Sequence, residues 1–298
     1  MKKIIAIAVA LFCALQICSA QTQEQTNKQI FKKVYAAVKD KADLPTGQLA
    51  LEIGKQFLET KYVSFTLEVE PEALQIFLDK TDCILFVELI SSFALTVKGE
   101  KIMQAGDGVN YCIRQTPYVV KAKPSYELLC HNIQNMRYRL GVVDGYGSRI
   151  HYTSEWILQN QTNGILYEFT KDYGTPINQS FYYMTTHPDS YRQLKGNPEE
   201  TAKVKEAELR LCCQVPYYKI TQEQLRKPEV ISRIQEGDII TFVDTAPGLD
   251  LAHVAMACKG EDGQMHFIHA SYGYKKVVLE PKTLADYAKN GIRVSRLR

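Results

Sequence analysis

The sequence predicts an α+β fold in which helices come first and an antiparallel sheet comes last. In the first two thirds of the chain, apolar residues recur at helical spacing behind residues that cap helices. From Gly237 onward, short apolar runs alternate with turn residues, which is typical of strands. No stretch rich in Pro, Gly or Ser separates the two parts, so residues 21–298 are expected to form a single domain.

Residues 1–20 have the pattern of a secretory signal. Lys2 and Lys3 precede an apolar stretch that ends in a small-residue Cys-Ser-Ala cleavage pattern. The stretch is too short for a membrane span, which needs roughly 20 apolar residues. Ile17 stands before Cys18 where a lipoprotein signal has a small residue. We therefore expect an exported, periplasmic protein whose mature form has no membrane anchor.

Charge and cysteine content narrow the function classes. The formal net charge is +3, and removal of two lysines with the signal lowers it to +1. Nucleic acid is therefore not an expected partner, because its phosphates demand a basic surface. An exported compartment permits disulfides, but no CxxC pair is present and the sequence does not settle the pairing. The cysteines that remain after cleavage are Cys83, Cys112, Cys130, Cys212, Cys213 and Cys258.

Six helices are expected, each placed by a capping residue before it or by a glycine after it. They cover residues 27–41, a segment capped by Thr46, an apolar run from Cys83 to Val97 closed by Gly99, a segment from Ser125 through Leu140 closed by Gly141, a short one from Thr153 through Gln159, and a charged, exposed one after Asn197. The run that begins at Cys83 is apolar on nearly every side, so we expect it in the core.

Five short strands are expected in the C-terminal part, and together they should form an antiparallel meander or partial barrel. They are "DIITFVD", "AHVAMAC", "MHFIHAS", "KKVVLE" and "GIRVSRL".

Cys83 is a candidate nucleophile because of its position. It follows Thr81 and Asp82, which favour helix caps, and it stands directly before the apolar helical run. A helix N-terminus presents unpaired N–H groups and the positive end of the helix dipole, which favour a thiolate. Position alone is weak evidence, because buried structural cysteines are commoner than nucleophiles.

A catalytic thiol needs a base, and His253 and His269 stand in neighbouring predicted strands. A two-residue turn between these strands would place the two histidines on opposite faces of the sheet. A three-residue loop over residues 261–263, with Gly263 in the left-handed conformation, would pair Ala255 with His269 and set His253 diagonally beside it. The catalytic interpretation therefore predicts the loop of odd length. Alternatively, each histidine is a hydrogen-bonded core residue.

A zinc site is a weaker interpretation of the same histidines. His266 precedes His269 by three residues and should point to the other face of the strand, so His253, His266 and His269 are not expected to bind one metal together. We expect no metal and no cofactor.

Four stretches occur in the order found in one superfamily. "TDCILFVE", "EGDIITFV", "AHVAMAC" and "FIHAS" resemble the Asp-Cys helix start and the three following strands of the NlpC-type papain-like cysteine hydrolases of bacterial cell walls. "KYVSFTLE" and "RYRLGVVDGYGSRIHYTSEWI" are similar to the N-acetylmuramoyl-L-alanine amidase-like branch, formerly a domain of unknown function. Phe65 stands where that branch usually has glycine, and Ala255 where the superfamily usually does; both should narrow the cleft.

The resemblance implies a papain-like fold and a role for each matching residue. Cys83 would be the nucleophile, His253 the general base and His269 the group that orients it. Tyr62 would donate its hydroxyl to the oxyanion beside the backbone N–H of Cys83. The residues expected to line the substrate cleft are Arg149, Tyr152 and Trp156, although composition alone places Trp156, the single tryptophan, in the core.

The sequence thus predicts an exported cysteine amidase that hydrolyses the N-acetylmuramoyl-L-alanine bond of peptidoglycan fragments (muropeptides) through a thioester. The bond is implied by the resemblance, whereas Cys-His amide hydrolysis follows from the residues. Three alternatives remain at this point: an endopeptidase that cuts D-glutamyl from the diamino acid, a non-catalytic cell-wall-binding module, and a metal-dependent amidase.

Overall fold

The computed structural model describes residues 21–103, 119–214 and 216–298. The expected export signal, residues 1–20, lies outside the described residues, and so does Cys112. In the described part of the chain, no helix combines the length and the apolar character that crossing a bilayer requires. The five cysteines described there are all free thiols.

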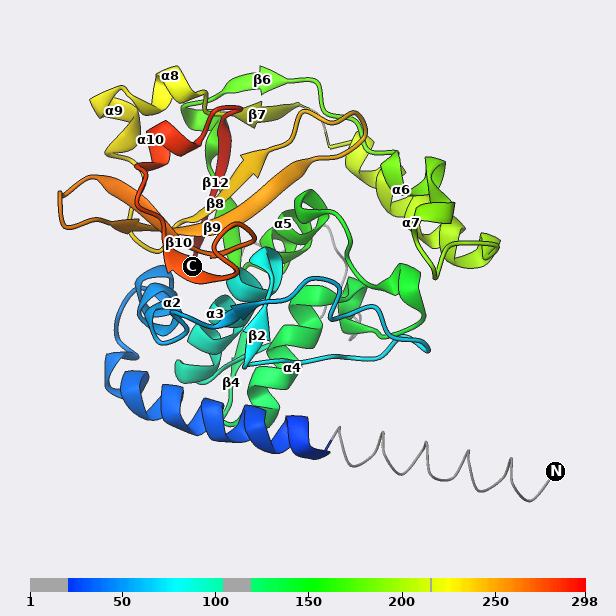
Figure 1. The fold of residues 1–298 in the computed structure, drawn as a ribbon, viewed down its shortest axis with the longest axis horizontal. Helices are drawn as coiled ribbons and strands as arrows, with labels where there is room; N and C mark the ends of the chain where they lie inside the picture. Colours follow the sequence, from blue (N-terminus) through cyan, green and yellow to red (C-terminus); the bar gives the residue numbers. More distant parts are fainter. Residues whose placement is uncertain (1–20, 104–118, 215) are drawn as a thin grey trace.

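An eight-stranded sheet forms the centre of the protein, with the strand order β2-β1-β11-β10-β9-β8-β12-β5 (Figure 1). All five strands predicted for the C-terminal part are present: β8 (Ile239–Val243), β9 (Leu251–Lys259), β10 (Met265–Ser271), β11 (Lys276–Leu279) and β12 (Ile292–Leu297). Strands β8 to β11 form the predicted antiparallel meander, and β12 returns to pair with β8. The fold is therefore α+β, as predicted.

Three short strands from the first part of the chain extend this sheet: β1 (Lys61–Tyr62), β2 (Lys80–Thr81) and β5 (Leu166–Glu168). The sheet is mixed, because β1 and β2 pair in parallel. Two small sheets stand apart from it, formed by β3 (Glu100–Ile102) with β4 (Val119–Lys121) and by β6 (Thr175–Ile177) with β7 (Tyr217–Lys219). None of these short strands was predicted.

The predicted helices are present with altered ends. Residues 21–38 are helical, and the other long helices are α2 (Thr46–Lys55), α3 (Cys83–Val97), α4 (Tyr126–Arg137), α5 (Thr153–Thr162) and α7 (Pro198–Cys212). The short ones are α6 (Tyr183–Thr186), α8 (Gln222–Leu225), α9 (Pro228–Ile231) and α10 (Leu284–Tyr287). Ser125 and Asn197 cap α4 and α7 as expected. Thr46 and Thr153 are instead the first helical residues, and neither makes a cap.

The helix predicted through Leu140 stops earlier. Tyr138 takes an extended conformation, and its buried hydroxyl donates to Glu72 Oε1 at 2.7 Å. This contact ends α4 at Arg137, and Leu140 lies beyond the helix with 47% of its surface exposed. Burial of Tyr138 thus outweighs the apolar pattern that favoured a longer helix.

The two faces of the sheet are covered by different helices (Figure 1). Val254 and Met256 of β9 pack with α2 and α3 in the larger core, in which α3 is buried from Leu85 to Val97. Ala255 and Ala257 of the same strand pack with α8, α9 and α10. Alternation along β9 thus gives each face its own core.

Candidate active site

Cys83 is the first residue of the buried helix α3. The carboxylate of Asp82 accepts the backbone N–H of Leu85 at 3.0 Å, so Asp82 is the N-cap, as predicted. Thr81 lies in β2 and pairs with Tyr62 in β1. The sequence Thr-Asp-Cys therefore forms a junction between strand and helix that fixes the cysteine next to Tyr62.

Burial dominates the electrostatics of Cys83. It raises the pKa of the thiol to about 12, and the neighbouring Asp82 carboxylate raises that pKa further. Backbone N–H groups of Val254 and Ile84 act in the opposite direction. Loss of solvent therefore opposes the thiolate more strongly than the helix N-terminus favours it, contrary to the expectation from the sequence. The contribution of Val254 also places the sulfur beside β9, directly after His253.

The turn between β9 and β10 has the predicted odd length. Met265 pairs with Lys259, and the backbone N–H of Gly260 donates to the carbonyl of Gln264 at 2.9 Å. Three loop residues remain between this last pair, and Gly263 has φ +75°. The prediction about the turn is confirmed. Ile268 pairs with Met256, so the same register places His269 opposite Ala255.

This register brings His253 and His269 into direct contact. Nε2 of His253 lies 2.6 Å from Nδ1 of His269. Burial lowers the pKa of His253 to about 4 and that of His269 to about 3. Both rings are therefore neutral near neutral pH, and one proton is shared in the hydrogen bond between them. Nδ1 of His253 is left as the nitrogen that can accept another proton.

Glu280 extends the pair of histidines, and the sequence prediction missed it. Its Oε2 lies 3.3 Å from Nε2 of His269, and the carboxylate is buried. A carboxylate at this distance favours the tautomer of His269 that carries its proton on Nε2. Nδ1 of His269 then accepts the proton of His253 Nε2. The signal was available, because His269 pairs with Val278, and Glu280 lies two residues further on the same face.

All the residues predicted to bind substrate line one cavity with Cys83, of about 360 Å³. Tyr62 is half-buried in its wall, and burial raises the pKa of its hydroxyl to about 12, so the hydroxyl can donate a hydrogen bond. Arg149 is held by carboxylates: its Nη2 donates to Glu68 at 2.9 Å, and its Nε lies 3.2 Å from Glu72. The guanidinium thus enters the cavity wall already paired.

Tyr152 and Trp156 contribute less to the cavity than was expected. Tyr152 is 3% exposed, and its hydroxyl donates to Glu208 of α7 at 2.9 Å. Trp156 is 2% exposed and packs in the larger core. Both residues line the cavity with little exposed surface, and the burial of Trp156 agrees with the core position expected from composition alone.

The histidines line a second cavity of about 430 Å³, together with Tyr272 and Tyr287. The ring of Tyr62 meets the ring of Tyr272 edge to face, with centroids 5.7 Å apart. Tyr62 thus belongs to the wall of the first cavity and touches the wall of the second. Cys83 lines the first cavity and the two histidines line the second, so neither of these two cavities contains all three residues.

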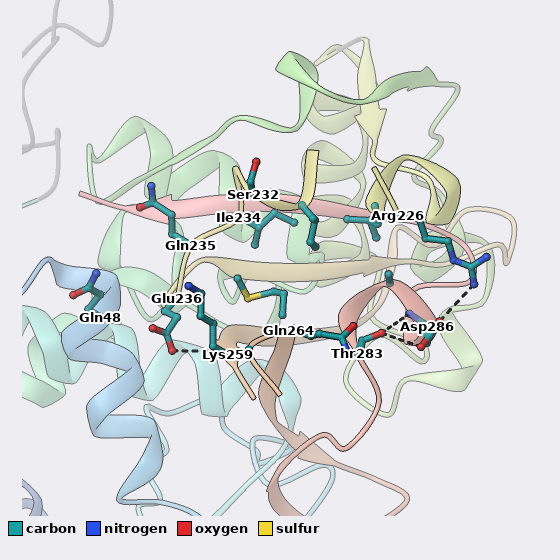
Figure 2. A pocket seen from close by; sticks show the side chains of 15 residues that line it. Gln48, Arg226, Ser232, Ile234, Gln235, Glu236, Lys259, Gln264, Thr283 and Asp286 are labelled. Carbon is teal, nitrogen blue, oxygen red and sulfur yellow. Dashed lines mark hydrogen bonds and ion pairs between the residues drawn. The ribbon is translucent and has the colours of Figure 1, made fainter. Parts of the chain in front are cut away.

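A larger cavity, of about 750 Å³, lies elsewhere (Figure 2). It is bordered by the turn between β9 and β10 and by α8 to α10, and it contains none of the predicted site residues. Two of its charged residues, Arg226 and Asp286, approach each other at 3.5 Å. Outside this cavity, His266 bonds to the carbonyl of Glu280 at 3.0 Å, away from the His253 pair. Within the described residues, no group of three or more His, Cys, Asp or Glu could hold a metal ion.

Comparison with known proteins agrees with the sequence resemblance. A crystal structure of an N-acetylmuramoyl-L-alanine amidase from Bacteroides uniformis is 32% identical, with a TM-score of 0.71, over 85% of this chain and 99% of that one. A protein of Bacteroides fragilis, provisionally named a xylanase, is 33% identical, with a TM-score of 0.66, over 82% and 98%. A Legionella pneumophila protein shares the fold at 20% identity, with a TM-score of 0.61, over 93% and 96%.

No protein with a curated description matches the chain. The family comparison is decisive, since the match covers residues 52–292, from α2 to the start of β12. This range includes Cys83, both histidines, Glu280 and all four residues of the first cavity that were predicted to bind substrate. The chain belongs to the N-acetylmuramoyl-L-alanine amidase-like family.

Proposed function

We propose that the protein is an exported, periplasmic cysteine amidase that hydrolyses the amide between N-acetylmuramic acid and L-alanine in muropeptides. The family and the name of the Bacteroides uniformis protein support the bond. The observation that carries the cysteine mechanism is the 2.6 Å contact between His253 and His269, on the strand that Cys83 approaches. A helix that starts with cysteine and packs on antiparallel strands also supports a papain-like core of the NlpC type.

The first half-reaction transfers the acyl group to Cys83. Nδ1 of His253 takes the thiol proton as the sulfur attacks the amide carbonyl, and the carbonyl oxygen becomes an oxyanion. The hydroxyl of Tyr62 and the backbone N–H of Cys83 donate hydrogen bonds to this oxyanion. The tetrahedral intermediate then collapses: the C–N bond breaks, His253 returns the proton to the leaving amine, and a thioester remains.

The second half-reaction reverses these roles. Water enters, His253 removes its proton, and the resulting hydroxide attacks the thioester carbonyl. The C–S bond breaks, the sulfur recovers the proton from His253, and the free acid leaves. Water is the only co-reactant that the two half-reactions need.

The neutral state of both groups suits this sequence. Burial lowers the pKa of His253 to about 4, so the base is unprotonated near neutral pH. Burial raises the pKa of Cys83 to about 12, so the thiol keeps its proton until His253 can accept it during the attack. The proton therefore moves within the complex with substrate, as general-base catalysis requires.

A digest of defined muropeptides followed by mass spectrometry tests the proposal. The wild type should release the intact stem peptide and the free N-acetylmuramyl sugar, and Cys83→Ala should release neither. Cys213→Ala, which changes an exposed thiol directly after α7, is the matched control and should keep wild-type turnover. Release of the diamino-acid peptide, with L-alanyl-D-glutamate still attached to the sugar, would instead identify the endopeptidase, and absence of any cleavage by the wild type would favour the binding module.

A further inference from the structure

Phe65 has an unusual backbone and an unusual exposure. It follows β1 with φ +61°, in the left-handed region that a bulky residue rarely adopts. Its side chain is 83% exposed, the largest value among the exposed large hydrophobic residues of the described chain. It also lines the cavity that contains Cys83. A strained aromatic residue at a cavity beside a reactive group is a candidate for ligand contact.

Contacts on both sides impose this conformation. The backbone N–H of Val63 donates to the carbonyl of Thr81 at 2.8 Å, which ties the segment to β2. On the other side, Glu68 accepts from Arg149 Nη2 at 2.9 Å, and its backbone N–H donates to the carbonyl of Phe65 at 3.3 Å. The segment is therefore tied to β2 on one side and to Arg149 on the other, and Phe65 lies between these two contacts.

Core packing does not account for the ring. Phe65 is not a member of any of the three apolar clusters, whereas its neighbour Tyr62 packs against the larger one. A glycine would adopt the same backbone without strain and would leave no apolar ring in water. The ring thus adds strain and exposed apolar surface, and neither is compensated by contacts within the described protein.

The chemistry of the two cavities determines which part of a substrate Phe65 can meet. In the proposed reaction the acyl group becomes attached to the sulfur of Cys83, whereas the leaving amine receives its proton from His253. Cys83 lines the first cavity, and His253 lines the second. The first cavity therefore takes the acyl side of the scissile amide, and the second takes the amine side. Phe65 lies on the acyl side.

We propose that Phe65 determines specificity by stacking its ring against a pyranose ring carried on the acyl side of the substrate. The C–H groups on one face of a pyranose form an apolar surface that fits an exposed aromatic ring. The inference rests on the proposed function, because that function places the sugar on the acyl side.

Binding to a variant without the nucleophile tests this inference. In Cys83→Ala, calorimetry gives the dissociation constants of an N-acetylmuramoyl-L-alanyl peptide and of the same peptide without the sugar. Adding Phe65→Gly should weaken the sugar-bearing ligand about three- to tenfold and leave the free peptide unchanged. Phe65→Trp in the same background should restore the affinity. Because glycine suits φ +61°, the thermal midpoint of Phe65→Gly should not fall by more than a few degrees.

The inference is overturned if Phe65→Gly leaves the affinity for the sugar-bearing ligand unchanged, if it weakens both ligands equally, or if that ligand does not bind to Cys83→Ala. Because no turnover is measured, this result is independent of the mass-spectrometric digest. A wild type that releases no stem peptide would overturn the proposed function and leave the binding result to decide on Phe65. Normal release together with unchanged affinity would overturn the role of Phe65 alone.

Discussion

Replacement of His269 by alanine examines how the base is prepared. Nε2 of His253 lies 2.6 Å from Nδ1 of His269, and Glu280 lies on the other side of His269 at 3.3 Å. Without His269, the N–H at Nε2 of His253 is buried and has no partner in the tautomer that leaves Nδ1 free for the thiol. The ring of His253 is then stabilised if it turns or if its proton moves to Nδ1. Either change leaves Nδ1 unable to accept the proton of Cys83.

The size of the effect follows from the cost of an unpartnered buried N–H. That cost is about 1–3 kcal/mol. If it falls entirely on the reactive arrangement of His253, kcat decreases about 5- to 150-fold. His269→Asn keeps an acceptor oxygen and should recover part of the loss.

Steady-state kinetics on a muropeptide, with stem-peptide release as the readout, gives kcat and KM for each variant. His269→Ala should lower kcat with little change in KM, since the loss concerns proton transfer and not binding. His187→Ala is the matched control, because His187 is exposed and lies at the end of α6. A kcat for His269→Ala equal to that of the wild type would refute the role of His269 in orienting the base.

Three further outcomes are expected. Since burial lowers the pKa of His253 to about 4, kcat/KM should be constant at mildly acidic pH and fall as the pH drops through about 4. The unfolding free energy measured in urea should decrease as the pH falls from about 6.5 toward 4, because the unfolded chain binds more protons than the folded chain over this range. A urea midpoint that does not change between these pH values would contradict this. Asp82→Ala should lower the unfolding free energy by about 1 kcal/mol, and Asp82→Asn should lower it much less, because asparagine also caps; equal losses would refute the cap. Nε of the buried Arg137 donates to Glu88 at 2.9 Å, so Glu88→Ala leaves the Arg137 charge buried without this partner. The unfolding free energy should then fall by about 3–5 kcal/mol in chemical denaturation, and a loss below about 1 kcal/mol would contradict this.

The features that depend on local sequence were predictable. The cap at Asp82, the start of α3 at Cys83 and the five C-terminal strands follow from residue types and periodicity. The meeting of His253 and His269 was also predictable as a condition on the turn, because side chains alternate along strands and a loop of odd length fixes the parity. Gly263 indicated that loop by its freedom to adopt a left-handed conformation.

Features set by distant contacts were not predictable in the same way. Strands β1 and β2 are two residues long and exist because each finds a partner in the sheet. The end of α4 depends on the burial of Tyr138 against Glu72, which is remote in sequence. The pKa of Cys83 depends on how completely the assembled fold removes water from its sulfur, so the helix dipole alone gave the wrong direction.

The covalent intermediate tests the central claim most directly. The wild type is quenched with acid during turnover of an N-acetylmuramoyl-L-alanyl peptide and digested with a protease, and the peptide that contains Cys83 is examined by mass spectrometry. We predict that this peptide gains the mass of the N-acetylmuramoyl group and that Cys83→Ala neither forms the adduct nor releases stem peptide. Release of stem peptide by Cys83→Ala at the wild-type rate, or an adduct on Cys83 that carries part of the stem peptide, would contradict the account.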